Sequence, residues 1–402
     1  MSWESVKLGD IADFSNGINF GKEAYTKGIK LIGVSNFGNR FFPEYDELEE
    51  VKEEVVRQND LLQTGDIVFV RSNGNKELVG RCMLIDNAPA KVTFSGFCIK
   101  ARFKNREEHD PCFWTYHFKN QGFRKAMSGT AIGANIQNLS QGRLAVYEAL
   151  VPDIHTQRRI ASILSKYDEL IENNQKQIKL LEEAAQRLYK EWFVDLRFPG
   201  YEGMEIVDGI PKGWTENTID SFIELQSGYA FKSSSFDDSG NYKIVTIKNV
   251  QDGAFDGDNV NKVVEIPDKM PSHCKLQEGD SLLSLTGNVG RVCTVIGDNY
   301  LLNQRVAKIA SDYPFFSYCL FRSDKMFHDM NNLANGAAQQ NLSPIRTGQM
   351  KVVKPDDEVL LKFEQMVKPI LDKKIVLNRD ILVAVQARDC LLPKLMSGEI
   401  EV

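Results

Sequence analysis

The chain has 402 residues, of which 42% are hydrophobic and 26% are charged, with 49 Lys and Arg against 55 Asp and Glu. This composition rules out a disordered or collagenous chain, and the net charge of -6 argues against a protein that coats nucleic acid by bulk electrostatics. No apolar run is as long as a membrane span, which needs about 20 residues. The start MSWESVKLGDIADF lacks the features of a secretory signal. We therefore expect a soluble, cytoplasmic protein without a membrane partner.

The first 150 or so residues alternate short apolar runs with polar turns. The segments DIVFVRS (66–72) and CMLIDN (82–87) are rich in β-formers and are bounded by Gly, Asn and Asp, which predicts short strands. The stretch from Pro111 to Met127 is aromatic and has helical periodicity. We expect a mixed α and β module.

A long amphipathic helix follows this module. From Ile154 to about Phe193 there is no Gly or Pro, and apolar residues recur at helical spacing, among them Ile160, Leu181 and Leu188. A Gly- and Pro-rich linker spans 198–214, and the segment SLLSLTG (281–287) predicts a strand of a second module. A second helix is expected from about Asp356 to Leu392.

The two halves of the chain resemble each other. Trp3, Leu8, Gly17 and Phe20 recur 211 residues later as Trp214, Ile219, Gly228 and Phe231. Similarly, LLQTGDIVFVRSNGN from Leu61 is echoed by KLQEGDSLLSLTGN from Lys275, and NLSQGRLAVYEALVP from Asn138 by NLSPIRTGQMKVVKP from Asn341. Their shared order indicates a duplicated unit. We expect an α+β fold in which two homologous mixed α/β modules are separated by two long antiparallel helices that form a coiled coil.

Motifs for stand-alone catalysis or metal binding are missing from the sequence. The seven cysteines never occur as C-x-x-C, so we assign no zinc site, no other metal site and no disulfide framework. Gly21-Lys22 is followed by Glu23 where a phosphate-binding loop needs Ser or Thr. No two prolines are adjacent, so the chain also lacks the P-P motif of amino-methyltransferases. We expect no catalytic residues.

The chain resembles the specificity (S) subunits of type I restriction-modification systems. The resemblance rests on TQRRIASILSKYDELIENNQKQIKLLEEAAQRLYKEWFVDLRFPG (156–200), LLPKLMSGEI (391–400) and the module openings WESVKLGDIADFSNG and GWTENTIDSFIELQSG. It implies target recognition domains at 1–153 and 214–355, spacer helices at 154–198 and 356–402 (the latter with a C-terminal tail), and a linker at 199–213. It further implies a non-catalytic subunit that binds double-stranded DNA, two modification methyltransferase subunits and the restriction subunits. S-adenosylmethionine would be bound by the methyltransferase partners.

The charge pattern agrees with DNA binding by the modules. Seven acidic residues are concentrated in 44–54, a solvated face that would repel phosphate, whereas 71–143 holds 12 Lys and Arg against 5 Asp and Glu. This surplus predicts a basic surface of about +7. The interval 286–351 has a weaker bias, 7 against 4.

Base contacts require Arg, Lys, Asn, Gln or Ser on protruding loops. We select a loop after a strand and a Gly-rich loop before a helix in each module; an ordinary solvated turn is the alternative for each residue. The candidates are Arg71, Ser72, Asn73, Asn75, Lys76, Ser128, Thr130, Asn135 and Gln137 in the first module, and Thr286, Asn288, Arg291, Asn335, Gln339 and Gln340 in the second.

The hypothesis is that each module reads one half of an asymmetric bipartite DNA site and that the helices set the spacer between the halves and dock the methyltransferases. Two alternatives remain open. One is the specificity subunit of a different restriction class, and the other is a coiled-coil scaffold whose modules bind proteins instead of DNA.

Overall fold

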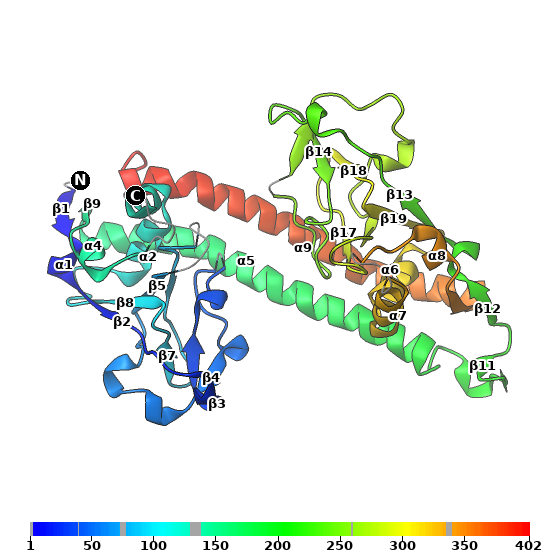
Figure 1. Ribbon diagram of the computed structural model, residues 1–402, viewed down its shortest axis with the longest axis horizontal. Helices are drawn as coiled ribbons and strands as arrows, with labels where there is room; N and C mark the ends of the chain where they lie inside the picture. The colour runs from blue at the N-terminus through cyan, green and yellow to red at the C-terminus, as the bar shows by residue number, and fades with distance from the viewer. Residues whose placement is uncertain (1–2, 39, 73–77, 129–137, 259, 335–339) are drawn as a thin grey trace. The chain divides into compact units, whose positions relative to one another are not determined.

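The computed structural model describes residues 3–38, 40–72, 78–128, 138–258, 260–334 and 340–402 (Figure 1). By the contacts between its residues the chain forms two units, unit 1 (residues 1–170 and 384–402) and unit 2 (residues 171–383). The predicted long helices contribute a segment to each unit. Each module is therefore packed against helix residues from both repeats.

Unit 1 contains two sheets and a short closing ladder. An antiparallel sheet has the order β2-β8-β5-β6, and a second sheet has the order β4-β3-β7, with β3 parallel to β7. The ladder joins β1 to β9, so that the beginning and the end of the module are adjacent. The strands are β1 (Glu4–Lys7), β2 (Ala12–Asn16), β3 (Tyr25–Ile32), β4 (Glu49–Val51), β5 (Ile67–Val70), β6 (Cys82–Leu84), β7 (Val92–Phe94), β8 (Cys98–Phe103) and β9 (Glu148–Val151).

Two helices of unit 1, α2 (Pro111–Lys119) and α4 (Gln141–Ala145), start at a capping side chain. Helix α2 has Pro at its first position, and the Asp110 carboxylate accepts a hydrogen bond from the Phe113 backbone N–H at 2.8 Å. Its aromatic side chains are buried against β5, whose four residues are all fully buried. Helices α1 (Leu8–Ile11), α3 (Gln121–Ser128) and α4 (Gln141–Ala145) complete the module. The predicted helical stretch and the predicted strands are confirmed.

Unit 2 repeats this arrangement. The sheet orders are β13-β19-β16-β17 and β15-β14-β18, with β14 parallel to β18, and β12 pairs with β20 as the closing ladder. Its elements are β12 (Thr215–Thr218), β13 (Ile223–Ser227), β14 (Tyr242–Val245), β15 (Asn261–Val263), β16 (Ser281–Ser284), β17 (Val292–Thr294), β18 (Tyr300–Leu302), β19 (Val306–Ser311), β20 (Lys351–Lys354), α6 (Pro314–Arg322), α7 (Asp324–Ala334) and α8 (Pro344–Gly348). The matching strand orders confirm the predicted duplication. A small hairpin of β10 (Ile206–Val207) and β11 (Ile210–Pro211) lies in the linker.

The two long helices are α5 (Ile154–Tyr189), which passes into a π-helical turn at Lys190–Val194, and α9 (Asp357–Ser397). Each begins after an Asp: the Asp153 carboxylate accepts from the His155 and Thr156 N–H groups, and the Asp356 carboxylate accepts from the Val359 N–H. The prediction that the second helix ends at Leu392 was wrong. The helix continues through Pro393 because Leu395 and Met396 are buried in the core of unit 1, which offsets the lost backbone hydrogen bond.

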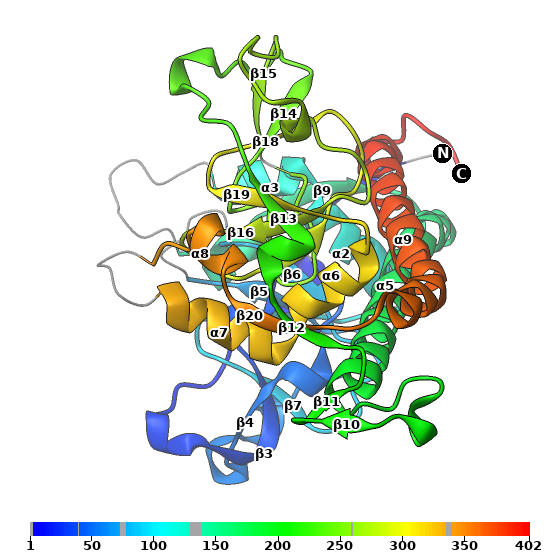
Figure 2. The ribbon, with the colours of Figure 1, turned by 90° about the vertical axis from the view of Figure 1, so that its right-hand side faces the viewer.

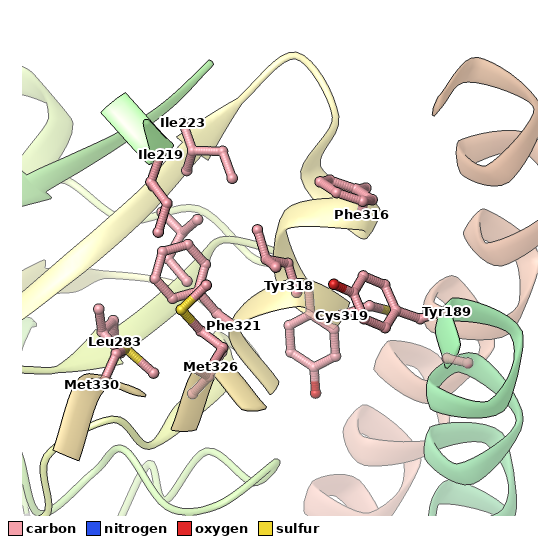
Figure 3. Close-up of a cluster of buried hydrophobic side chains, with 14 of the residues drawn as sticks. Tyr189, Ile219, Ile223, Leu283, Phe316, Tyr318, Cys319, Phe321, Met326 and Met330 are labelled. Atoms are coloured by element: carbon pink, nitrogen blue, oxygen red, sulfur yellow. The ribbon is translucent and has the colours of Figure 1, made fainter. Parts of the chain in front are cut away.

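Within unit 2 the two helix segments run antiparallel, as predicted (Figure 2). Residue 182 of α5 contacts residue 374 of α9, whereas the later Trp192 contacts the earlier Phe363. Helix α6 lies between these segments and the strands, and Figure 3 shows its aromatic side chains surrounded by buried residues from both sides. The large buried core of unit 2 is thus shared between module and helices.

A buried polar network ties α6 to both helices of unit 2. The Tyr318 hydroxyl lies 2.9 Å from a Glu182 carboxylate oxygen, and the Lys374 ammonium donates to both groups, at 2.7 Å to Glu182 and 2.5 Å to Tyr318. Arg322 adds a further hydrogen bond to Glu182 at 3.0 Å. Burial opposes the charge of Glu182, but Lys374 and Arg322 outweigh it and lower the pKa of this carboxyl group. Glu182 is therefore ionised at neutral pH and compensates the buried Lys374.

Unit 1 contains a network of the same chemistry. The Tyr116 hydroxyl of α2 donates to the Asp168 carboxylate of α5, and Arg388 of α9 donates to the same carboxylate at 2.5 Å. Burial and the neighbouring Asp168 charge raise the pKa of Tyr116, so the tyrosine keeps its proton and remains a donor. Both units therefore place a carboxylate on α5, a cation on α9 and a tyrosine on the module.

None of the helices in the described part of the chain has the length and hydropathy that a bilayer-spanning segment requires.

We expect Glu182→Ala to destabilise unit 2 by about 3–5 kcal/mol, because it leaves Lys374 buried without its carboxylate partner. The neighbouring Glu183 is exposed and serves as the control, so Glu183→Ala should change stability by less than about 0.5 kcal/mol. Calorimetric melting of both variants tests this expectation. Equal melting temperatures for the two variants would contradict a structural role for the network.

Candidate nucleic-acid interface

The loops selected from the sequence are joined in pairs by the fold. In unit 1, Ser72 and Asn138 form an isolated antiparallel bridge, and the Leu139 N–H donates to the Arg71 carbonyl at 2.9 Å. In unit 2, Thr286 and Asn341 form the equivalent bridge, and the Leu342 N–H donates to the Leu285 carbonyl at 2.7 Å. The loop after the strand and the end of the loop before the helix thus lie side by side in each module.

The repeated tripeptide Asn-Leu-Ser has a structural explanation at this junction. Asn138 and Asn341 supply the backbone bridge, and Leu139 and Leu342 are buried at 1% exposure. The following serines cap the short helices: the Ser140 hydroxyl accepts from the Arg143 N–H at 3.2 Å and the Ser343 hydroxyl from the Arg346 N–H at 3.4 Å. The tripeptide therefore anchors the loop.

Several predicted residues lie outside the described part of the chain, namely Asn73, Asn75, Lys76, Thr130, Asn135, Gln137, Asn335 and Gln339. Ser128 is the last residue of α3. Arg71 and Ser72 are half-buried, and the Arg71 guanidinium donates to the Gly96 carbonyl at 3.2 Å.

The predicted residues of unit 2 divide into two groups. Thr286 and Gln340 line a groove of about 820 Å³, together with Ser227, Leu285, Gln304, Arg305, Asn341, Leu342, Ser343 and Pro344. Asn288 is exposed on the neighbouring hairpin turn. Arg291 does not line this groove, because its guanidinium donates to the Gln251 side chain at 2.5 Å at the base of the hairpin.

The groove has the chemistry of a surface that binds hydrogen-bonding ligands. Its lining offers amides, hydroxyls and one guanidinium, and no carboxylate is among the described lining residues. The Thr286 Oγ1 atom is buried without a hydrogen-bond partner within the described ranges. An unpaired buried hydroxyl costs about 1–3 kcal/mol, which a ligand that supplies its hydrogen bond would recover.

The groove contains residues that sequence reasoning missed. Gln304, Arg305 and Ser227 come from segments that the loop analysis did not include, although all three are polar: Ser227 ends β13, and Gln304 and Arg305 directly precede β19. In unit 1 the positions of Ser227 and Pro344 are taken by Asn16 and Gln141, whose side-chain amides approach each other to 3.1 Å. The two modules therefore differ in the wall of this surface.

The predicted basic surface of unit 1 is only partly at the surface. Lys100 is buried and its ammonium donates to the Asn59 carbonyl at 2.8 Å, and Arg102 pairs with the fully buried Asp66 at 2.6 Å. Lys119 donates to the Arg40 carbonyl at 2.7 Å. Counting charges along the sequence overestimated the surface charge, because these cations stabilise turns inside the fold.

Comparison with known proteins agrees with this description. The family model of the type I restriction modification DNA specificity domain matches residues 1–183 and 211–352. The chain belongs to the type I restriction-modification DNA specificity family. The resemblance inferred from the sequence is thereby confirmed.

Curated relatives span most of the chain. The MjaIX specificity subunit of Methanocaldococcus jannaschii is 26% identical over 309 residues, covering 71% of this chain and 68% of the relative. The HindI specificity subunit of Haemophilus influenzae is 22% identical over 476 residues, covering 99% of each protein. The crystal structure of the type I S subunit from M. genitalium aligns with a TM-score of 0.60 at 16% identity, covering 98% of this chain and 96% of that one, which supports the fold.

The repeated glycine of the module openings determines the shape of this surface. A Cβ atom at Gly17 would lie 2.2 Å from the Phe94 carbonyl oxygen and 2.3 Å from that of Ser95, and one at Gly228 would lie 2.2 Å from the Asn303 oxygen. The backbone after β2 and β13 therefore reaches the turn before β8 and β19 only because these residues have no side chain.

We expect Gly17→Ala to lower the stability of unit 1 by about 2 kcal/mol or more, because the methyl group pushes two backbone segments apart. A methyl group at Gly142 of the same unit would meet no described atom within 4 Å, so Gly142→Ala in the helical α4 should be neutral or stabilising by up to about 1 kcal/mol. Chemical denaturation of the two variants checks the difference. If Gly17→Ala is no more harmful than Gly142→Ala, the close approach has been misjudged.

Proposed function

We propose that this chain is the sequence-specific DNA-recognition subunit of a type I restriction-modification complex and carries no catalytic residues itself. The observation that carries the proposal is that the family match falls in two stretches, each containing one module with the same pair of bridged loops. The groove of unit 2, rich in amides and hydroxyls, supports it, because such groups suit the donor and acceptor pattern of base edges.

The recognition domains in this proposal are residues 1–153 and 214–355. The contacts to DNA come from the loop residues selected from the sequence, including Arg71, Ser72, Thr286 and Gln340. Asn288 lies on the exposed turn that follows Thr286, whereas Arg291 acts by supporting its hairpin through Gln251. Because the two domains share a backbone and differ in loop side chains, each reads a different half-site, and the complete site is asymmetric and bipartite.

The partners in this proposal are two modification methyltransferase subunits and, through them, the restriction subunits. The duplicated modules and helices provide two similar docking surfaces, one for each methyltransferase. The methyltransferases bind S-adenosylmethionine and flip the target base out of the duplex, since recognition alone cannot expose the reacting atom. In this division of roles the chain supplies specificity and its partners supply chemistry.

The helices act as the ruler between the half-sites. The two buried networks are fourteen residues apart on α5, from 168 to 182, and fourteen apart on α9, from 374 to 388. Fourteen residues are two heptads, the repeat of a coiled coil. This regular spacing supports a continuous helix pair whose length sets the number of base pairs that are not read.

Methylation mapping tests the proposed function directly. A host with this gene and its methyltransferase gene should carry methylated adenines or cytosines in one bipartite sequence motif, and deletion of this gene should abolish that motif in long-read sequencing. If every methylated motif persists after the deletion, the proposal is contradicted. A purified complex that protects no particular DNA sequence would favour a scaffold, and a partner that fuses methylation with cleavage would place the chain in another restriction class.

We expect the insertion of seven residues into both helices, after Gln175 and after Ile381, to lengthen the unread gap. A heptad adds about 10 Å of helix, which corresponds to about three base pairs. The control is the insertion of seven residues after the exposed Gly203 of the linker, which should leave the gap unchanged. Methylome sequencing measures both, and an unchanged gap after the double helix insertion would exclude the ruler.

A further inference from the structure

The same turn is built twice next to the paired loops, before β8 and before β19. In unit 1 the Gly96 N–H donates to the Ile18 carbonyl at 2.7 Å, and in unit 2 the Gln304 N–H donates to the Tyr229 carbonyl at 3.0 Å. The Cys98 N–H donates to Ser95 and the Val306 N–H to Asn303, each at 2.9 Å. Gly96 and Gln304 therefore occupy the same position in the two turns, and the residues that follow them, 97 and 305, are equivalent as well.

A further bond connects each turn to its loop after the strand. The Arg71 N–H donates to the Phe97 carbonyl at 2.8 Å, and the Leu285 N–H donates to the Arg305 carbonyl at 3.0 Å. The backbone position of residues 97 and 305 is therefore determined by the strands on both sides. The two modules present this position in the same way, and only the side chain differs.

The side chains at this position have opposite chemistry. Phe97 is 61% exposed although it is a large apolar residue. Arg305 is also exposed and lines the groove beside Thr286 and Gln340, and its guanidinium forms no hydrogen bond or ion pair with any residue for which coordinates are described. Among the described residues, Phe97 makes no ring contact and the Arg305 guanidinium makes no polar contact that would hold either side chain in the fold.

At the neighbouring position, residue 71 in unit 1 and residue 285 in unit 2, the arginine lies in unit 1 and the apolar residue in unit 2. Where unit 1 has Arg71, with its guanidinium against the Gly96 carbonyl, unit 2 has the buried Leu285. Each module thus carries one arginine and one apolar side chain at two adjacent positions, with their places exchanged. The exchange changes the chemistry of the surface while the backbone bonds at the two positions stay the same.

We propose that Phe97 and Arg305 are specificity-determining residues that each contact one base in the half-site of their own module. Phe97 makes an apolar contact with a thymine methyl group in the major groove, and Arg305 donates two hydrogen bonds to guanine O6 and N7. The amides beside Arg305, and the Thr286 hydroxyl, which has no hydrogen-bond partner among the described residues, bind the adjoining base edges. This inference rests on the proposed function, because it assigns residues to the DNA reading that the family implies.

The test uses the complete complex, co-expressed with its methyltransferase partner. Phe97→Ala should relax the methylated motif at one base pair of one half-site, and Arg305→Ala at one base pair of the other, each lowering discrimination there by about tenfold or more. Arg305→Lys should also relax that position, because an ammonium keeps the charge but lacks the bidentate geometry. The remaining positions of the motif should be read as before.

Matched variants separate the outcomes. Tyr25→Ala removes another exposed aromatic residue of unit 1, and Lys269→Ala another exposed cation of unit 2, and both should leave the motif unchanged. Equal weakening at every base, with full activity for Arg305→Lys, would mean a phosphate contact and would overturn the assignment of Arg305. An unaltered motif for Phe97→Ala and Arg305→Ala would overturn the inference as a whole. If the wild-type complex itself methylates no defined sequence, it is the proposed function that fails.

Discussion

The fold depends on keeping two buried charges paired. In each unit a tyrosine of the module donates to a carboxylate of α5, and a cation of α9 neutralises that carboxylate. An unpaired charge at such depth is unfavourable by several kcal/mol, so module, α5 and α9 must be in place together. The network is not simply inherited from the duplication, because Tyr116 is the sixth residue of α2 whereas Tyr318 is the fifth residue of α6. Two different sets of residues satisfy one constraint.

A module held in this way can vary its binding surface without losing its shape. The charges and the aromatic core position α2 and α6, whereas Gly17 and Gly228 bring the ends of β2 and β13 to the turns before β8 and β19. Between these points the backbone is determined by bonds that do not involve the side chains of residues 97 and 305. A phenylalanine and an arginine are therefore equally compatible with it. The side chain at this position can therefore change while the backbone that carries it stays the same.

The sequence was informative where the signal was local or repeated. Helical periodicity predicted α5 and α9, and the matching segments predicted the duplication that the strand orders confirm. The sequence was not informative where tertiary contacts determine the structure. Burial of Leu395 and Met396 extends α9 past Pro393, and Lys100 is buried although the sequence analysis counted it as surface charge. Phe97 and Arg305 escaped notice because their equivalence depends on bonds to Ile18 and Tyr229, about 75 residues away in the chain, and not on similar residue types.

The same contacts reduce the number of surface cations in a chain whose net charge is already -6. Most affinity for DNA comes from cations that neutralise phosphates. In unit 1 the cations Lys100, Arg102 and Lys119 are bound to carbonyls or to Asp66, and Arg40 neutralises part of the acidic segment through Glu44 at 2.9 Å. These four cations are therefore less available to the DNA backbone, while the amides, the hydroxyls and Arg305 of the unit 2 groove face a ligand in our proposal. If the chain acts as we propose, it contributes discrimination between sequences, and the affinity must come from the subunits that it assembles.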